Sequence, residues 1–145
     1  MAAMTDTPRW ISATFSMPGL LLIARIALVS AFLIGGIQKL ADFPAAVAEQ
    51  AHFGLEPAWL WAIAAIVVEL GGSALVIVGH WVWLGAGGLG VLTAVSMLVA
   101  NNFWALTGHD RFMATNAFFE HLGLIAGLVL ITALSLREQQ RGYHA

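Results

Sequence analysis

Four long runs of apolar residues, separated by short polar segments, take up most of the chain. They cover about residues 18–40, 58–78, 82–103 and 116–136. Each run is long enough to cross the hydrocarbon core of a bilayer as a helix, which takes about 20 residues. The pattern therefore predicts an all-α membrane protein in which residues 18–136 form a bundle of four transmembrane helices.

Polar segments connect and flank the spans. Residues 1–17 are expected to form a short cytoplasmic N-terminal segment, and residues 137–145 a short cytoplasmic tail. The longest connection, residues 41–57, is polar and has room for a short interfacial helix. Residues 106–115 are expected to form a second polar loop, and a tight turn at residues 79–80 joins the two middle spans.

Tryptophan positions agree with these boundaries. Amphipathic indole rings gather at the two membrane–water interfaces. Five of the six tryptophans lie near predicted span ends: Trp59, Trp61, Trp81, Trp83 and Trp104. The lipid bilayer is therefore the first partner that the sequence indicates.

Basic residues outside the spans predict the orientation. Arg9, Arg137 and Arg141 lie on one side of the membrane, against Lys39 and Arg111 on the other. Cytoplasmic segments carry the excess of Lys and Arg. Both termini are therefore expected in the cytoplasm, with the chain as a multi-pass protein of the inner membrane.

Composition narrows the classes of partner. The chain is 60% hydrophobic and 10% charged, whereas soluble proteins are about a quarter charged. A net charge of −2, with six Lys and Arg in total, leaves no basic face for a row of phosphates, so no nucleic-acid partner is expected. The chain has no cysteine and therefore no thiolate ligand for an iron–sulfur cluster.

Four charged residues fall within or at the edge of the apolar spans: Arg25, Lys39, Glu69 and Glu120. A charged side chain at the centre of a bilayer costs about 2.5 kcal/mol or more, so such residues face the bundle interior and mark candidate functional positions. These four residues are the first candidates for an intramembrane polar site.

Helical periodicity predicts inward faces for all four charges. Arg25 and Lys39 are about four turns apart, on one stripe of the first span with Val29, Phe32 and Gly36. Glu69 lies on a stripe of its span with Ala62, Ala65 and Gly72. Glu120 lies on a stripe of its span with Asn116, Gly123 and Gly127. Small residues allow helix backbones to approach closely, so these stripes are suited to burial between helices.

Depth along the helices suggests two pairs of opposite charge. At a rise of about 1.5 Å per residue, Arg25 is expected to meet Glu69, and Lys39 to meet Glu120 near the opposite surface. Two interpretations of such pairs stay open. They either lock the helices together without chemistry, or Glu69 relays a proton or binds a polar headgroup.

Further polar residues lie near the same end of the bundle. His121 follows Glu120 but points about 100° away around the helix, and we include it among the candidate ligand-site residues. Asn101, Asn102 and Asn116 are candidates for the mouth of a cavity, although Asn101 and Asn102 could instead satisfy the end of a helix.

No metal, haem or nucleotide is expected. A haem between helices commonly takes two facing histidines, whereas the other four histidines fall in predicted loops or the tail. Gly85, Gly87 and Gly90 match the spacing of a dinucleotide fingerprint, but no strand precedes them. Close packing between membrane helices explains these glycines better.

Several short motifs together resemble the DoxX family of small four-helix membrane proteins. They are Arg25, residues 35–40 (GGIQKL), residues 52–55 (HFGL) and residues 68–72 (VELGG), within a resemblance that covers about residues 20–134. Relatives in that family include a subunit of an archaeal thiosulfate:quinone oxidoreductase and bacterial proteins associated with membrane oxidoreductase complexes. The resemblance implies a membrane subunit that binds a quinone or docks a redox partner, with Arg25, Lys39 and Glu69 as matching polar positions.

Three functional hypotheses follow. The first is a redox-associated subunit whose polar cluster binds a quinone or similar lipophilic ligand, so that any catalysis belongs to a complex with an oxidoreductase partner. The second is a scaffold whose charges lock the helices and whose loops, residues 41–57 and 106–115, contact a partner complex. The third is a small-solute transporter, which would need homo-oligomers because four helices enclose little volume.

Overall fold

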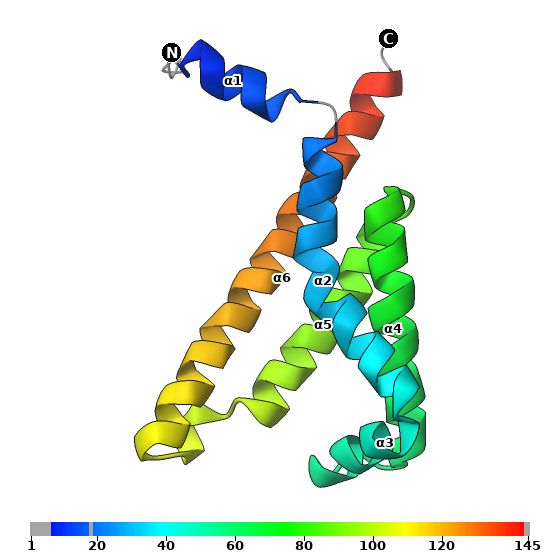
Figure 1. Ribbon diagram of the computed structural model, residues 1–145, viewed down its shortest axis with the longest axis vertical. Helices are drawn as coiled ribbons and strands as arrows, with labels where there is room; N and C mark the ends of the chain where they lie inside the picture. Colours follow the sequence, from blue (N-terminus) through cyan, green and yellow to red (C-terminus); the bar gives the residue numbers. More distant parts are fainter. Residues whose placement is uncertain (1–6, 18, 144–145) are drawn as a thin grey trace.

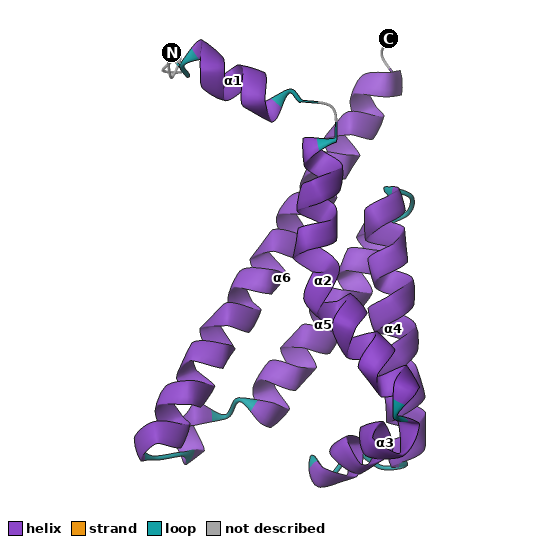
Figure 2. Ribbon diagram, viewed as in Figure 1, coloured by secondary structure: helices purple, strands orange, loops and turns teal. Residues whose placement is uncertain are grey.

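The computed structural model describes residues 7–17 and 19–143. Throughout these residues every regular element is helical, and no strand occurs (Figure 2). Four helices are long and apolar enough to cross a membrane. They are α2 (Leu20–Ala41), α4 (Ala58–Val78), α5 (Val82–Ala100) and α6 (Gly108–Tyr143). The predicted all-α membrane fold with four spans is thereby confirmed.

Three short elements complete the chain: α1 (Arg9–Phe15), α3 (Phe43–His52) and the 3-10 helix η1 (Phe103–Ala105). Helix α3 lies within the longest polar connection. The Asp42 carboxylate accepts a hydrogen bond from the Ala45 N–H at 3.1 Å, and Pro44 lies in the first turn. A capping carboxylate followed by a first-turn proline is a strong start signal for a helix.

Three predicted span boundaries were wrong. Helix α5 ends at Ala100 instead of residue 103, and η1 follows it. Helix α6 begins at Gly108 and runs to Tyr143, so most of the predicted loop 106–115 and of the predicted tail is helical. The polar residues at each end of α6 interrupt the apolar run but not the backbone hydrogen bonds. At about 1.5 Å per residue α6 is roughly 54 Å long, well beyond the hydrocarbon core of about 30 Å.

Some expectations fall on residues outside the described part of the chain. Pro18, expected to start the first span, is one of them, and so are residues 1–6 and 144–145 of the terminal segments. Helix α2 begins after Gly19, which has a φ of 92°.

The helices form two diverging pairs (Figure 1). Helix α2 packs along α4, α5 packs along α6, and α4 and α5 join the two pairs. The closest approach of α4 and α5 is at two glycines. A Cβ built on Gly85 would lie 2.6 Å from the Gly72 carbonyl oxygen, so only glycine fits there. Helix α1 and the C-terminal end of α6 lie at one end of the molecule, and α3 and η1 at the other.

Two of the predicted inward faces are confirmed. Val29, Phe32 and Gly36 of α2 are buried. On α4 the buried residues include Glu69 together with its predicted neighbours Ala62, Ala65 and Gly72.

The predicted inward face of α6 was wrong at three of its four positions. Glu120, Asn116 and Gly123 are exposed, whereas Gly127 is half-buried against Leu28 of α2. The buried positions are instead Ala114, Leu128, Ile131 and Ser135. The half-buried His121 lies on one line with Ala114, Leu128 and Ser135, at intervals of seven residues, which is close to two helical turns. His121, and not Glu120, therefore faces the bundle.

Candidate functional site

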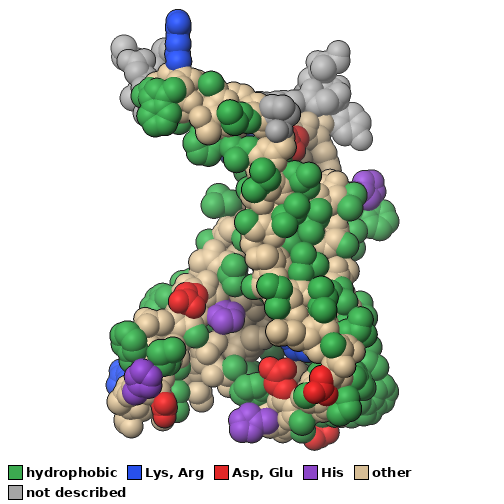
Figure 3. Space-filling view, in the orientation of Figure 1, with side chains coloured by type: hydrophobic (Ala, Val, Ile, Leu, Met, Phe, Trp, Pro, Cys, Tyr) green, Lys and Arg blue, Asp and Glu red, His purple; other side chains and the backbone are tan. Residues whose placement is uncertain are grey.

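A cavity of about 760 Å³ lies between the two helix pairs, in the half of the bundle that α3 covers. Side chains from α2, α3, α4, α5 and α6 line it. Its walls are mostly apolar, and Figure 3 shows the corresponding hollow in the surface. The polar side chains on the wall are Lys39, Glu49, Gln50, Glu69, Thr93, Ser96, Asn101 and His121.

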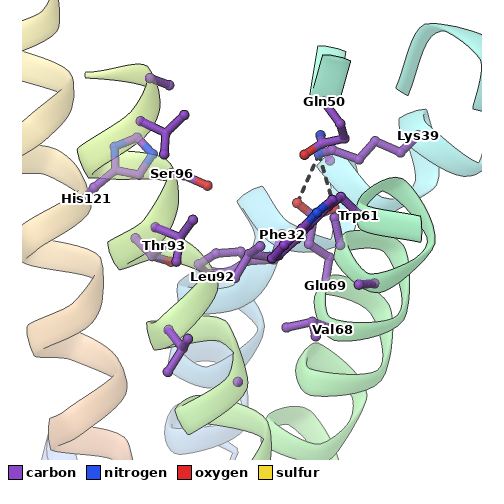
Figure 4. A pocket seen from close by; sticks show the side chains of 18 of the residues that line it. Phe32, Lys39, Gln50, Trp61, Val68, Glu69, Leu92, Thr93, Ser96 and His121 are labelled. Atoms are coloured by element: carbon purple, nitrogen blue, oxygen red, sulfur yellow. Dashed lines mark hydrogen bonds and ion pairs between the residues drawn. The ribbon is translucent and has the colours of Figure 1, made fainter. Parts of the chain in front are cut away.

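An ion pair between α2 and α4 forms one wall (Figure 4). Lys39 Nζ donates to both carboxylate oxygens of Glu69, at 3.0 Å to Oε1 and 3.3 Å to Oε2. The two side chains are only 19% and 11% exposed. A Cβ built on Gly35 would lie 3.5 Å from both Lys39 Nζ and Glu69 Oε2. Because Gly35 has no side chain, no atom of α2 lies at that position between the ion pair and the cavity.

Both predicted charge pairs were wrong. Lys39 pairs with Glu69 and not with Glu120. Arg25 Nη2 donates to Ser135 Oγ at 3.1 Å and lies 3.7 Å from Glu138 Oε2, at the opposite end of the bundle from α3. Helical side chains lean toward the N-terminus of their own helix. Because α2 and α4 run in opposite directions, this lean brings Lys39 deeper into the bundle and Glu69 toward the α3 end.

His121 forms the opposite wall of the cavity. Its Nδ1 lies 2.6 Å from the Ala117 carbonyl oxygen, one turn earlier on α6. A carbonyl oxygen only accepts, so Nδ1 must carry the hydrogen and Nε2 keeps its lone pair when the ring is neutral. In Figure 4 the ring points from α6 toward Ser96 of α5, across the cavity from the ion pair.

Sequence reasoning missed the polar residues that complete the wall. Gln50 lies next to Lys39 in Figure 4, and Glu49 lies at the exposed rim. The signal for Gln50 was available, because it recurs at helical spacing with four apolar residues. These are Phe43, Ala46, Val47 and Phe53, and none of the five positions is exposed. Thr93 and Ser96 of α5 carried no comparable signal, since small hydroxyl residues are common in membrane helices.

The remaining candidates are distributed unevenly. Asn101 lines the cavity, whereas Asn102 and Asn116 do not. Arg25 lies at the other end of the bundle, and Glu120 is exposed on the outer side of α6. No group of three or more His, Cys, Asp or Glu that could hold a metal ion occurs in residues 7–17 and 19–143.

The arrangement places hydrogen-bonding groups of different kinds at two ends of an apolar space. Lys39 supplies an ammonium donor, Glu69 a carboxylate acceptor, and His121 a ring nitrogen that accepts when neutral and donates when protonated. Such a wall suits a flat, mostly apolar ligand with a polar atom at each end. Pockets for small ligands have this general form, an apolar lining with a few placed polar groups.

Comparison with known proteins adds two findings. The DoxX family model matches residues 20–102, which include Lys39, Glu69 and Ser96. "Inner membrane protein YphA" from Escherichia coli (strain K12) is 30% identical over 130 residues, or 90% of this chain and 92% of the relative. No solved structure matches the chain significantly.

Proposed function

Because the chain belongs to the DoxX family of integral membrane proteins, we propose that it is a redox-associated membrane subunit that binds a quinone headgroup in this cavity. The observation that carries the proposal is the Lys39–Glu69 ion pair facing His121 across an apolar space between transmembrane helices. The E. coli relative is an inner membrane protein, which supports the inner membrane as the location of this chain.

The size and lining of the cavity support a ligand of this class. Sites for small molecules are typically about 300–1,000 Å³, and the cavity has about 760 Å³. Phe32, Trp61, Val68 and Leu92 supply apolar and aromatic surface for the faces of a ring. A charged or sugar-like ligand would leave these walls in contact with polar groups that they cannot satisfy.

The polar groups match the hydrogen bonds that a quinone requires in either oxidation state. Lys39 donates, and a quinone carbonyl oxygen can only accept. Glu69 and the Nε2 lone pair of His121 accept, and the hydroxyl groups of a hydroquinone donate. When bound, the quinone would supply a two-electron, two-proton redox couple. Glu69 and His121 would hold or release the protons, and a partner oxidoreductase would exchange the electrons.

The test compares two variants with the same change of charge. Glu69→Gln removes the carboxylate on the cavity wall, whereas Glu120→Gln makes the same change on the exposed side of α6. The wild type and both variants are purified in native lipid discs, and co-isolated small molecules are identified by mass spectrometry. We expect about one quinone per chain in the wild type and Glu120→Gln, and at least tenfold less in Glu69→Gln.

Other outcomes of this experiment distinguish quinone binding from the scaffold hypothesis. Absence of quinone from all three samples would refute quinone binding. If a protein partner then co-purified equally with all three, the scaffold hypothesis would take its place. Equal quinone content in the wild type and Glu69→Gln would show that the ion pair is not part of the ligand site.

A further inference from the structure

The cavity has an open side between α2 and α6. These helices touch at Leu28, because a Cβ built on Gly127 would lie 2.8 Å from Leu28 Cδ1. One turn further along α6, toward α3, a Cβ built on Gly123 would meet no atom within 4 Å. Helices α2 and α6 therefore separate at the depth where the cavity begins, as Figure 1 shows.

The side between α4 and α5 is closed where these helices touch, since a Cβ built on Gly88 would lie 3.5 Å from Val68 Cγ1. The cavity-lining residues Ala64, Val91 and Val95 of the same two helices are exposed, so this side is only partly closed. Helix α3 packs on α4 and α2 at the end that faces the aqueous phase, and Gln50 and Phe53 of α3 line the cavity there. The space-filling view shows the hollow on the side of α2 and α6 (Figure 3).

Small residues line this open side. Ala31 and Gly35 of α2 both line the cavity, and Ala31 is exposed. Leu124 and His121 of α6 lie across from them. All of these positions lie within membrane-spanning helices, so the opening faces lipid and not water.

We propose that the ligand enters sideways from the bilayer, through the opening between α2 and α6. This inference rests on the proposed function and deepens it by naming the class of ligand. The ligand is a membrane-dissolved amphiphile, a quinone whose apolar tail stays in the opening while its headgroup reaches the ion pair and His121. A small polar quinone dissolved in water would not need to pass through an opening that faces lipid.

The test narrows the opening without touching the polar wall. Ala31→Phe places a ring in the opening, and Ala27→Phe places the same ring one turn away on α2, outside the cavity lining. Ala64→Phe narrows the α4–α5 side of the cavity instead. Binding in lipid discs is followed by the quenching of tryptophan fluorescence, because Trp61 lines the cavity.

We expect Ala31→Phe to slow binding of a quinone with an isoprenoid tail at least tenfold, and to slow binding of the same headgroup without a tail by a much smaller factor. Ala27→Phe should behave as the wild type. If the tailed quinone bound Ala31→Phe as fast as the wild type, or if Ala64→Phe alone slowed it, the proposed entrance would be refuted.

A second measurement does not depend on any quinone. The chain has no cysteine, so Ser96→Cys gives a single attachment site for a spin label inside the cavity. We expect the label to collide with lipid-soluble oxygen more than with a water-soluble nickel chelate, and Ala31→Phe to reduce the oxygen collisions. Greater access for the chelate would overturn the lateral entrance. If oxygen reached the label but no quinone bound, the lateral entrance would be supported and the proposal of quinone binding would be refuted.

Discussion

Lys39 and Glu69 carry opposite charges inside the membrane-spanning bundle. Either charge without the other would raise the free energy of the folded protein there. Taking one charge out of water costs several kcal/mol, and a partner at 3.0 Å offsets much of this. The pair also joins α2 to α4, the two helices that form one arm of the molecule. Stability and ligand binding therefore depend on the same two side chains, and they must be separated by experiment.

A double-mutant cycle makes that separation. Lys39→Met and Glu69→Gln each leave one buried charge unpaired, and we expect each to lower the free energy of unfolding by about 3 kcal/mol. The double variant carries neither charge, so it should recover most of that loss. Unfolding in detergent, followed by circular dichroism, measures the three values.

The quinone content of the double variant then distinguishes a ligand-binding role of the ion pair from a purely structural one. A double variant that is stable but binds no quinone supports a ligand site, whereas a stable double variant with a normal quinone content assigns the pair to structure alone. If the losses of the single variants simply added in the double variant, the ion pair would not couple α2 to α4.

The charged residues themselves could be read from the sequence, but their partners could not. Arg25, Lys39 and Glu69 all lie on the inward faces that periodicity predicts. The pairing failed because depth was estimated from the backbone, whereas a Lys or Glu side chain displaces its charge by about a helical turn. The Arg25 contacts with Ser135 and Glu138 were out of reach, because Glu138 belonged to a segment predicted as a polar tail.

Among the elements, α6 shows what an apolar pattern can and cannot define. The apolar run from residue 116 to 136 correctly indicated a span, but the helix continues beyond it in both directions. Glu120 and His121 are adjacent in the sequence but lie on different faces of this helix, so a polar residue marks each of two faces. Residues recur at intervals of seven on every face of a helix, so this spacing could not show that the face of Ala114, His121, Leu128 and Ser135 is the buried one.

The contact between α4 and α5 depends on the lack of a side chain at Gly85. We expect Gly85→Ala to destabilise the bundle by about 1–3 kcal/mol, because its Cβ would lie 2.6 Å from the Gly72 carbonyl oxygen and 2.9 Å from Leu75 Cβ. Gly90→Ala is the matched control on the same helix, since a Cβ there meets nothing within 4 Å.

Thermal unfolding in detergent should rank the variants. Gly90→Ala should unfold at or above the wild-type temperature, because alanine favours a helix over glycine. A Gly85→Ala variant as stable as the wild type would mean that α4 and α5 can move apart freely, contrary to the close contact described above.

For the whole molecule, an even number of spans places α1 and the end of α6 on one side of the membrane and α3 on the other. The fold is compatible with either orientation in the membrane, so the cytoplasmic location of the termini is a prediction from the basic residues. With that orientation, the cavity lies in the half of the membrane away from the cytoplasm.

Single cysteines test this orientation. Ala48→Cys lies on exposed α3 and Ala13→Cys on exposed α1. In spheroplasts, a membrane-impermeant maleimide should label Ala48→Cys directly and Ala13→Cys only after permeabilisation. The reverse pattern would place the termini outside and the cavity in the cytoplasmic half.

The separation of α2 from α6 has a thermodynamic consequence. A wedge of this kind within hydrocarbon does not stay empty, and acyl chains, which are as apolar as leucine, can fill it. A ligand that arrives from the side must then displace a phospholipid chain, so binding is an exchange. Its apparent affinity scales with the mole fraction of ligand in the bilayer and varies with acyl-chain composition, whatever the aqueous concentration.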